Sequence, residues 1–127
     1  MNLEKVIFGA FVILSCTLNF GFFIGDITDP AQHHSFELGA TIVVNLIAMT
    51  LKFGDRTHIG AVHLATSIVA VLQLVAGAVV WIWATRVSGL PTEGEVMATV
   101  VSLAGGALVA NFISVALLIG ETLRRVR

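Results

Sequence analysis

Charged residues are scarce in this chain, and their scarcity excludes most classes of water-soluble protein. Only 12% of the 127 residues are Asp, Glu, Lys or Arg, whereas a soluble domain carries about 25%. The formal net charge is −1, so the chain has no basic excess with which to bind nucleic acid. We therefore expect an environment other than water and no nucleic-acid partner.

The chain has a single cysteine and lacks the common catalytic motifs. The one cysteine, Cys16, cannot form an intrachain disulfide. The sequence contains no Ser–His–Asp or Cys–His arrangement, no phosphate-binding loop and no HExxH motif, so it gives no support for an enzyme. We therefore expect a non-enzymatic protein without a cofactor.

Long apolar runs fill the rest of the chain, which is 57% hydrophobic with a mean hydropathy of +0.96. They cover residues 6–25, 36–53, 59–85 and 96–120. A helix rises about 1.5 Å per residue, so about 20 apolar residues cross the hydrocarbon core of a bilayer. Backbone groups in lipid must pair within the chain, so each run should be a helix. The sequence predicts an all-α membrane protein, a four-transmembrane-helix bundle forming one domain over residues 1–127.

Basic residues are unevenly distributed between the connections. Lys52 and Arg56 flank the second connection, and three arginines lie at positions 124, 125 and 127, whereas the first connection has no Lys or Arg. Lys and Arg favour the cytoplasmic side of a membrane. We therefore expect both termini and the second connection to be cytoplasmic.

A weak internal repeat relates the second and fourth runs. Residues 40–55 align without gaps on residues 106–121, with Asn45 opposite Asn111 and Gly54 opposite Gly120. Apolar sequences often match by chance, so the alignment has two interpretations. The alternative to chance is a duplicated helical hairpin with both copies oriented alike, an arrangement found in small transporters.

The fourth run carries a small residue at every fourth position. These residues are Gly94, Ala98, Ser102, Gly106, Ala110 and Ser114. Such a face lets helix backbones approach closely in lipid. We predict helix packing at Ala98, Ser102, Gly106 and Ala110, either inside one molecule or between the copies of a homo-oligomer.

Polar residues within the runs form stripes at helical spacing, which we call the polar seam. Its members are Asn19, Thr41, Asn45, His63, Thr66, Gln73, Asn111 and Ser114. Polar groups in hydrocarbon should face the bundle interior and bond one another. The seam is either a set of interhelical hydrogen bonds or a pathway for a small cation or a proton. No acidic residue lies near the middle of a run, which disfavours a carboxylate-driven proton pump.

Two adjacent histidines, His33 and His34, lie near acidic residues in the first connection. Imidazole and carboxylate groups suit zinc, copper or nickel. Adjacent side chains on a helix point in different directions, so these two cannot easily reach one ion. We regard them as weak metal candidates and expect a solvated acidic loop without a metal.

The segment 50–55 (TLKFGD) resembles the potassium-channel filter pattern Thr-Val-Gly-Tyr-Gly-Asp. Such filters strip the ion of water with rings of backbone carbonyls. Lys52 departs from the pattern where glycine supplies a permissive backbone, and its charge would repel a cation. A potassium-channel-like pore subunit with a degenerate filter at Thr50–Asp55 is therefore an alternative with a different topology.

Three further segments carry a resemblance that extends over most of the chain. They are residues 18–23 (LNFGFF), 52–57 (KFGDRT) and 102–108 (SLAGGAL). With these segments the chain resembles small four-span bacterial membrane protein families of unknown function. The resemblance implies a multi-pass protein of the bacterial inner membrane and supplies no activity.

The function we expect follows from these features together. The chain should be a small polytopic membrane protein in the lipid bilayer, either a transport protein or an accessory subunit of an ion-transport complex. It should form a homo-oligomer or join a larger membrane complex. A purely structural or assembly role is a further alternative.

Overall fold

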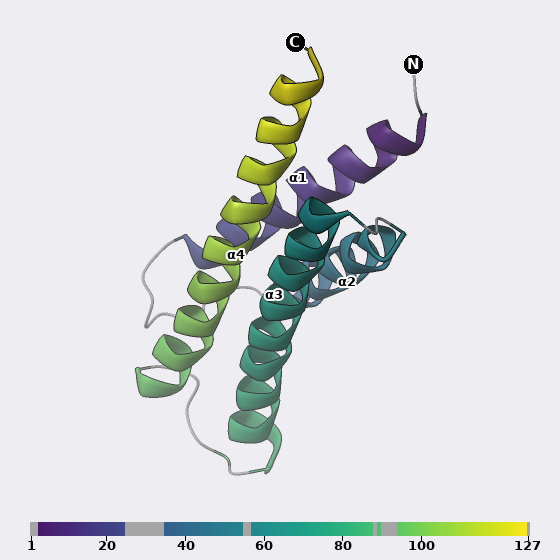
Figure 1. Ribbon diagram of the computed structural model, residues 1–127. Coiled ribbons are helices and arrows are strands. Elements are labelled where there is room, and N and C mark those ends of the chain that lie inside the picture. The colour runs from purple at the N-terminus through teal and green to yellow at the C-terminus, as the bar shows by residue number, and fades with distance from the viewer. Residues whose placement is uncertain (1–2, 25–34, 55–56, 88, 90–93, 127) are drawn as a thin grey trace.

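The computed structural model describes residues 3–24, 35–54, 57–87, 89 and 94–126, and these form a helical bundle (Figure 1). The helices are α1 (Leu3–Phe23), α2 (Ser35–Lys52), α3 (His58–Ile82) and α4 (Glu95–Val126), with a short π-helical segment, η2 (Trp83–Val87), continuing α3. The described residues thus confirm the predicted all-α class.

Each predicted apolar run corresponds to one helix, with ends that differ by a few residues. The start of α3 has a clear local cause, because the Thr57 side chain accepts a hydrogen bond from the Gly60 backbone N–H at 3.1 Å. This bond satisfies one of the donors that a helix N-terminus leaves open. The largest difference lies in α4, which continues to Val126 and not to residue 120. Polar and basic residues end an apolar run but are good helix formers, so the helix outlasts the run.

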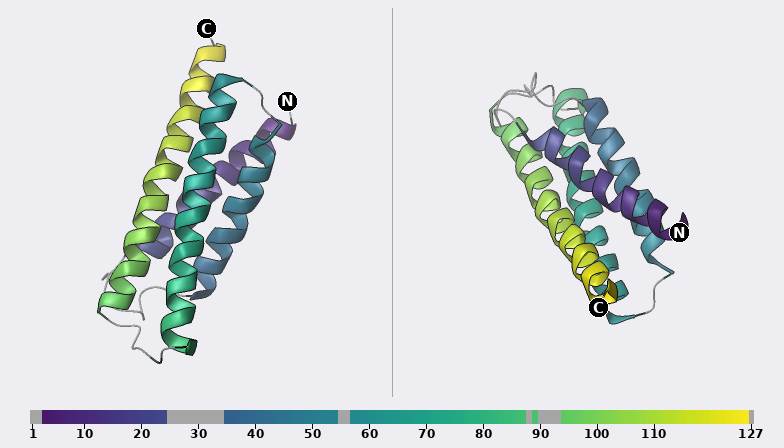
Figure 2. Two further views of the ribbon diagram at one scale, coloured as in Figure 1. Left: turned by 60° about the horizontal axis from the view of Figure 1, so that its bottom comes forward. Right: turned by 90° about the horizontal axis from the view of Figure 1, so that it is seen from above.

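The helices run alternately up and down, as Figures 1 and 2 show. Each helix packs against the next, α4 packs back against α1, and α3 and α4 share the most extensive contact. The start of α1, the end of α2, the start of α3 and the end of α4 therefore lie at one end of the bundle, which we call the termini end. The opposite end is called the distal end.

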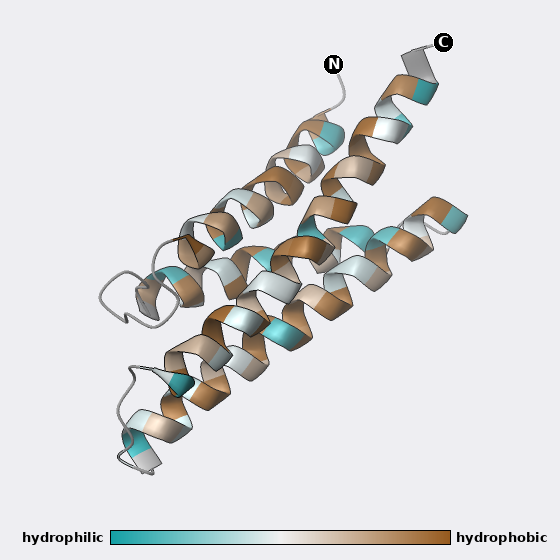
Figure 3. Ribbon diagram, turned by 90° about the vertical axis from the view of Figure 1, so that its left-hand side faces the viewer, coloured by the Kyte–Doolittle hydropathy of each residue, from teal (hydrophilic) through white to brown (hydrophobic). Residues whose placement is uncertain are grey.

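Three of the described helices are long and apolar enough to cross a membrane. They are Leu3–Phe23, His58–Arg86 and Glu95–Arg124. The shorter α2 has 18 residues, with Glu37 in its first turn and Lys52 in its last, and it is not among these three. Figure 3 shows hydrophobic residues along all four helices. These features are those of a membrane protein.

The outer surface of the bundle is rich in large apolar side chains. Exposed examples on the four helices are Ile13, Phe20, Val43, Leu46, Leu72, Val79, Phe112 and Ile119. A monomer in water rarely exposes apolar side chains on this scale, because they gain free energy by leaving water. Lipid is the surrounding that suits this surface.

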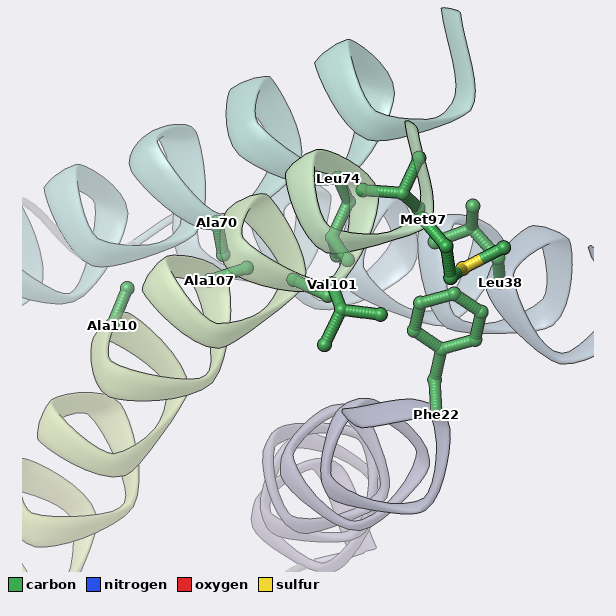
Figure 4. Close-up of a cluster of buried hydrophobic side chains, with 10 residues drawn as sticks. Phe22, Leu38, Ala70, Leu74, Met97, Val101, Ala107 and Ala110 are labelled. Carbon is green, nitrogen blue, oxygen red and sulfur yellow. The ribbon is translucent and has the colours of Figure 1, made fainter. Parts of the chain in front are cut away.

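Large apolar side chains from all four helices meet inside the bundle near the distal end. Phe22 of α1 points toward Leu38 of α2 and Met97 of α4, and Leu74 of α3 lies beside them (Figure 4). Phe22, Leu74 and Met97 are completely buried. We call these four side chains the distal plug.

Candidate functional site

Buried polar side chains from all four helices gather inside the bundle. They are Ser15, Asn19, Thr41, Asn45, Lys52, His63, Thr66, Ser67, Asn111 and Ser114. All members of the predicted polar seam are therefore buried except Gln73, which is half-buried. Burial is what the low polarity of the surroundings requires of such groups.

Three of these side chains form a cluster toward the termini end. Lys52 Nζ of α2 donates to Ser114 Oγ of α4 at 2.6 Å. His63 Nδ1 of α3 lies 3.3 Å from the same hydroxyl oxygen. The exposed fractions of Lys52, His63 and Ser114 are 3%, 2% and 1%. One serine hydroxyl thus joins a cation and an imidazole from three helices.

The position of Lys52 follows from the stripe on α2. Thr41, Asn45 and Lys52 are separated by four and seven residues, so one helix face carries all three. Thr41 Oγ1 donates to the Glu37 carbonyl at 2.7 Å and Asn45 Nδ2 donates to the Thr41 carbonyl at 2.8 Å. Only the long lysine side chain reaches across to α4.

The hydrogen-bond roles in the cluster follow from the chemistry of the groups. An ammonium has three donors and no acceptor, so Ser114 Oγ must accept from Lys52. The hydroxyl hydrogen of Ser114 is then available for His63 Nδ1. His63 Nδ1 accepts that hydrogen in one tautomer and donates its own proton to Ser114 Oγ in the other, and the imidazole is neutral in both. The cluster therefore carries one positive charge, on Lys52.

No carboxylate in the described part of the chain forms an ion pair with this charge. The one hydrogen bond that Lys52 makes there goes to Ser114. Taking an ammonium out of water costs several kcal/mol, about as much as a good partner returns. A neutral hydroxyl compensates only part of that cost.

The cluster lies at the floor of a cavity of about 580 Å³ at the termini end. The cavity is lined by Glu4, Lys5, Ile7, Phe8, Leu51, Lys52, Gly60, His63, Leu118, Glu121 and Thr122. Glu4, Lys5 and Thr122 are exposed, whereas Lys52 and His63 are buried. The cavity therefore has a charged rim and a floor formed by Lys52 and His63 of the cluster. The Phe8 ring meets the His63 ring edge-on, with their centroids 5.7 Å apart.

A second polar contact lies deeper in the bundle and joins α1 to α4. The Asn19 amide is oriented so that its nitrogen donates to the Ala104 carbonyl at 2.9 Å. Its oxygen then accepts from Asn111 Nδ2 at 3.0 Å and from the Leu108 N–H at 3.1 Å. Asn111 is thus paired with Asn19, and Asn45 bonds to its own helix.

The small-residue face of α4 has two different surroundings. Ala110 and Ser114 are buried, Ala98 and Gly106 are half-buried, and Ser102 is exposed. A Cβ atom placed on Gly106 would lie 2.8 Å from Gln73 Nε2 of α3. The face therefore packs inside the bundle toward the termini end, and at Ser102 it turns outward.

Gln73 itself keeps one unsatisfied atom. Its side-chain oxygen is buried, and no donor in the described residues reaches it. The predicted seam therefore does not continue as a connected chain of hydrogen bonds from Asn111 to Gln73.

The backbone at residues 50–54 differs from that of a channel filter. Thr50, Leu51 and Lys52 continue α2 as a helix, and Phe53 N–H donates to the Thr50 carbonyl at 3.3 Å in the turn that follows. A filter needs extended carbonyls directed at an ion. Residues 50–52 are helical and the Thr50 carbonyl already accepts a hydrogen bond within the chain, which argues against a filter here.

Three predicted positions lie outside the described residues. They are the weak metal candidates His33 and His34 and the last residue of the filter-like segment, Asp55.

Sequence reasoning placed Lys52 on one helix face with Thr41 and Asn45 but left it out of the predicted polar seam. We expected it to mark the cytoplasmic connection and did not assign it to the site. Its spacing from Thr41 and Asn45 was the available signal, because the same stripe that buries these two residues continues to Lys52.

Comparison with known proteins gives one match. A family model described as a family of unknown function (DUF6394) matches residues 32–122. This range contains all of α2 and α3, most of α4, and the three residues of the cluster. No curated protein and no solved structure matches the chain. The chain belongs to the DUF6394 family.

Proposed function

We propose that this chain is a non-enzymatic integral membrane protein that takes part in ion transport, either as the transporter or as an accessory subunit of an ion-transport complex. The observation that carries the proposal is the buried Lys52–Ser114–His63 cluster at the floor of the termini-end cavity. All four helices cross the bilayer in this proposal.

The cost of the buried charge supports a functional role. A methionine or leucine at position 52 would fill similar space, and replacing buried ions by apolar side chains is often neutral or stabilising. An ionisable residue that faces the interior of a membrane bundle is by default a candidate functional group. A purely structural bundle gains nothing evident from Lys52.

The shape of the interior favours a transport role over a purely structural role. Lys52 and His63 line a cavity at the termini end, and the distal plug fills the interior at the other end. A binding group accessible from one side and closed on the other is the arrangement that alternating access requires. Opening of the distal plug would then expose the cluster to the other side.

The expected location follows from the basic residues. Arg124 and the arginines at 125 and 127 lie at the C-terminus, and Lys and Arg favour the cytoplasm. The protein is then a multi-pass protein of a bacterial inner membrane with both termini in the cytoplasm. With 18 residues, α2 is about 27 Å long, close to the thickness of a hydrocarbon core.

Reconstitution into liposomes tests this function. If the chain is itself the transporter, the purified protein should give ion flux that Lys52→Met abolishes. If it is an accessory subunit, the purified protein should give no flux, a transport complex should co-purify from native membranes in mild detergent, and Lys52→Met should reduce the flux of that complex. Arg86→Met, which removes one exposed charge at the distal end, is the matched control.

Two results would remove the proposal. One is the absence of flux together with the absence of any co-purifying transport protein. The other is a Lys52→Met variant that leaves all flux unchanged, because a structural or assembly role predicts that this substitution is silent.

A further inference from the structure

We infer that the Lys52 cluster binds a small monovalent anion, and that a short-chain monocarboxylate fits it best. This inference rests on the proposed transport function and names its substrate class. It replaces the cation or proton expected from the seam, because the fixed charge at the cavity floor is positive.

The first argument is the number of hydrogen-bond donors. Lys52 Nζ has three N–H donors, and within the described residues one of them is used, on Ser114 Oγ. Lys52 also lines the cavity. Two donors of this cation are therefore unused by the described residues, and charge-assisted bonds to an anion are the strongest that they can form.

The second argument is the local charge. His63 is neutral in the hydrogen-bond arrangement of the cluster, so one bound monovalent anion would balance Lys52. The remaining charged groups that line the cavity are Glu4 and Lys5 of α1 and Glu121 of α4. Two carboxylates and one ammonium make this rim negative by one charge. A negative rim opposes multivalent anions more strongly than monovalent ones.

The third argument is the character of the walls. Four apolar side chains, Ile7, Phe8, Leu51 and Leu118, line the cavity above the cluster. A pocket with an apolar wall and one fixed charge suits a ligand with an apolar body and one charged end. A short-chain monocarboxylate has this composition, whereas a halide would leave the apolar wall facing water.

Binding can be measured as a shift of the midpoint of thermal unfolding, Tm, in nanodiscs of phosphatidylcholine. Sodium butyrate, sodium chloride and sodium sulfate are compared at equal ionic strength. A ligand that binds the folded state raises Tm with its concentration. We expect butyrate to give a saturable rise, chloride a smaller one and sulfate none.

Variants assign the shift to the cluster. Lys52→Met should abolish the butyrate response, and Lys52→Arg should keep part of it because the charge remains. Ser114→Ala should weaken it several-fold, and provides a second variant if Lys52→Met fails to fold. Arg86→Met, with an equal loss of charge at the distal end, should respond like the wild type.

The anionic group has a second source, the phosphodiester of a lipid. Nanodiscs that contain phosphatidylglycerol distinguish the two: a Lys52-dependent rise in Tm from this lipid, without a butyrate response, supports the anion site and assigns it to lipid. A butyrate response of equal size in Lys52→Met, or no Lys52-dependent response to butyrate, chloride or phosphatidylglycerol, overturns the inference. Butyrate binding without any flux leaves the inference intact and removes the transport proposal alone.

Discussion

At the scale of single residues, the buried ammonium of Lys52 carries a large desolvation cost. It lies inside the bundle with one hydroxyl as its hydrogen-bond partner. The effect of a substitution on the free energy of unfolding depends on whether it removes this group or its partner. Removing the charge also removes its desolvation cost, whereas removing its partner leaves that cost in place.

The two substitutions should therefore change the free energy of unfolding in opposite directions. Lys52→Met should stabilise the ligand-free protein or leave it unchanged, within the range of about 0–4 kcal/mol seen when buried ions are replaced by apolar groups. Ser114→Ala should destabilise it by about 1.5–3 kcal/mol, the value of a hydrogen bond to a charged group. Unfolding by SDS in mixed micelles measures both. A clear destabilisation by Lys52→Met would mean that the charge is well compensated.

The amides of Asn19 and Asn111 should behave as a coupled pair. Because they bond to each other across α1 and α4, Asn19→Leu and Asn111→Leu should each destabilise the bundle, and the double mutant should lose less than the sum. We expect a coupling free energy of about 0.5–2 kcal/mol. The control is a double-mutant cycle of Asn45→Leu with Asn111→Leu. Because the Asn45 amide bonds to its own helix, the two effects should be additive within about 0.5 kcal/mol. Equal coupling in both cycles would contradict this pairing.

The burial of these residues could be predicted from the sequence, but their partners could not. A polar side chain in a long apolar run avoids lipid by facing the interior of the bundle. Thr41, Asn45 and Asn111 are buried accordingly. The partner of each depends on the depth at which two helices meet. The internal repeat placed Asn45 and Asn111 at one level, where they could bond each other, Asn19 or Gln73. The crossing of α1 over α4 brings Asn19 to Asn111.

At the scale of the helices, two adjacent glycines of α4 allow side chains of α1 and α3 to approach its backbone closely. A Cβ atom on Gly105 would lie 2.8 Å from Cε1 of Phe23 in α1, and one on Gly106 would meet the Gln73 amide of α3. The two glycines thus face two neighbouring helices. Gly120, also in α4, has no atom of another residue within 4 Å of such a position.

Leucine at these positions should separate the helices. Gly105→Leu should destabilise the bundle by about 1–3 kcal/mol, the usual cost of overpacking, because the Phe23 ring has to move. Gly106→Leu should cost less if the flexible Gln73 side chain turns aside. The free energy of unfolding in mixed micelles measures each change, and Gly120→Leu is the control that should be silent. Equal losses at all three sites would contradict the packing account, because Gly120 faces no neighbouring helix and leucine is a better helix former than glycine.

The bounds of the helices could be predicted from the sequence, but their arrangement in space could not. Apolar runs bounded by Gly, Pro and charged residues locate the helices to within a few residues, because lipid and helix geometry set their length. The angle at which α1 crosses α4 (Figure 2) depends on packing at positions such as Gly105. The periodicity of apolar residues does not show which small residues make these contacts. Asn45 and Asn111, which the internal repeat aligns, are both buried. The duplication of a helical hairpin stays a prediction.

At the scale of the whole molecule, the number of spans decides the sides on which the termini lie. With four spans the two termini share one side, and with α2 outside the bilayer they lie on opposite sides. Reporter fusions before Met1 and after Arg127 should both report the cytoplasm, because of the C-terminal arginines. A fusion within residues 28–35 should report the other side. Termini on opposite sides would reduce the protein to three spans.

The central claim is that the Lys52 cluster lies at the floor of a cavity that is open at the termini end and closed by the distal plug. Labelling of single cysteines by a membrane-impermeant maleimide tests it most directly, in sealed vesicles of both orientations and in a Cys16→Ala background. His63→Cys should react from the side of the termini alone, and Leu74→Cys, within the plug, should react from neither side. Reaction of Leu74→Cys from the distal side, or a His63→Cys variant that reacts from neither side, would contradict the account.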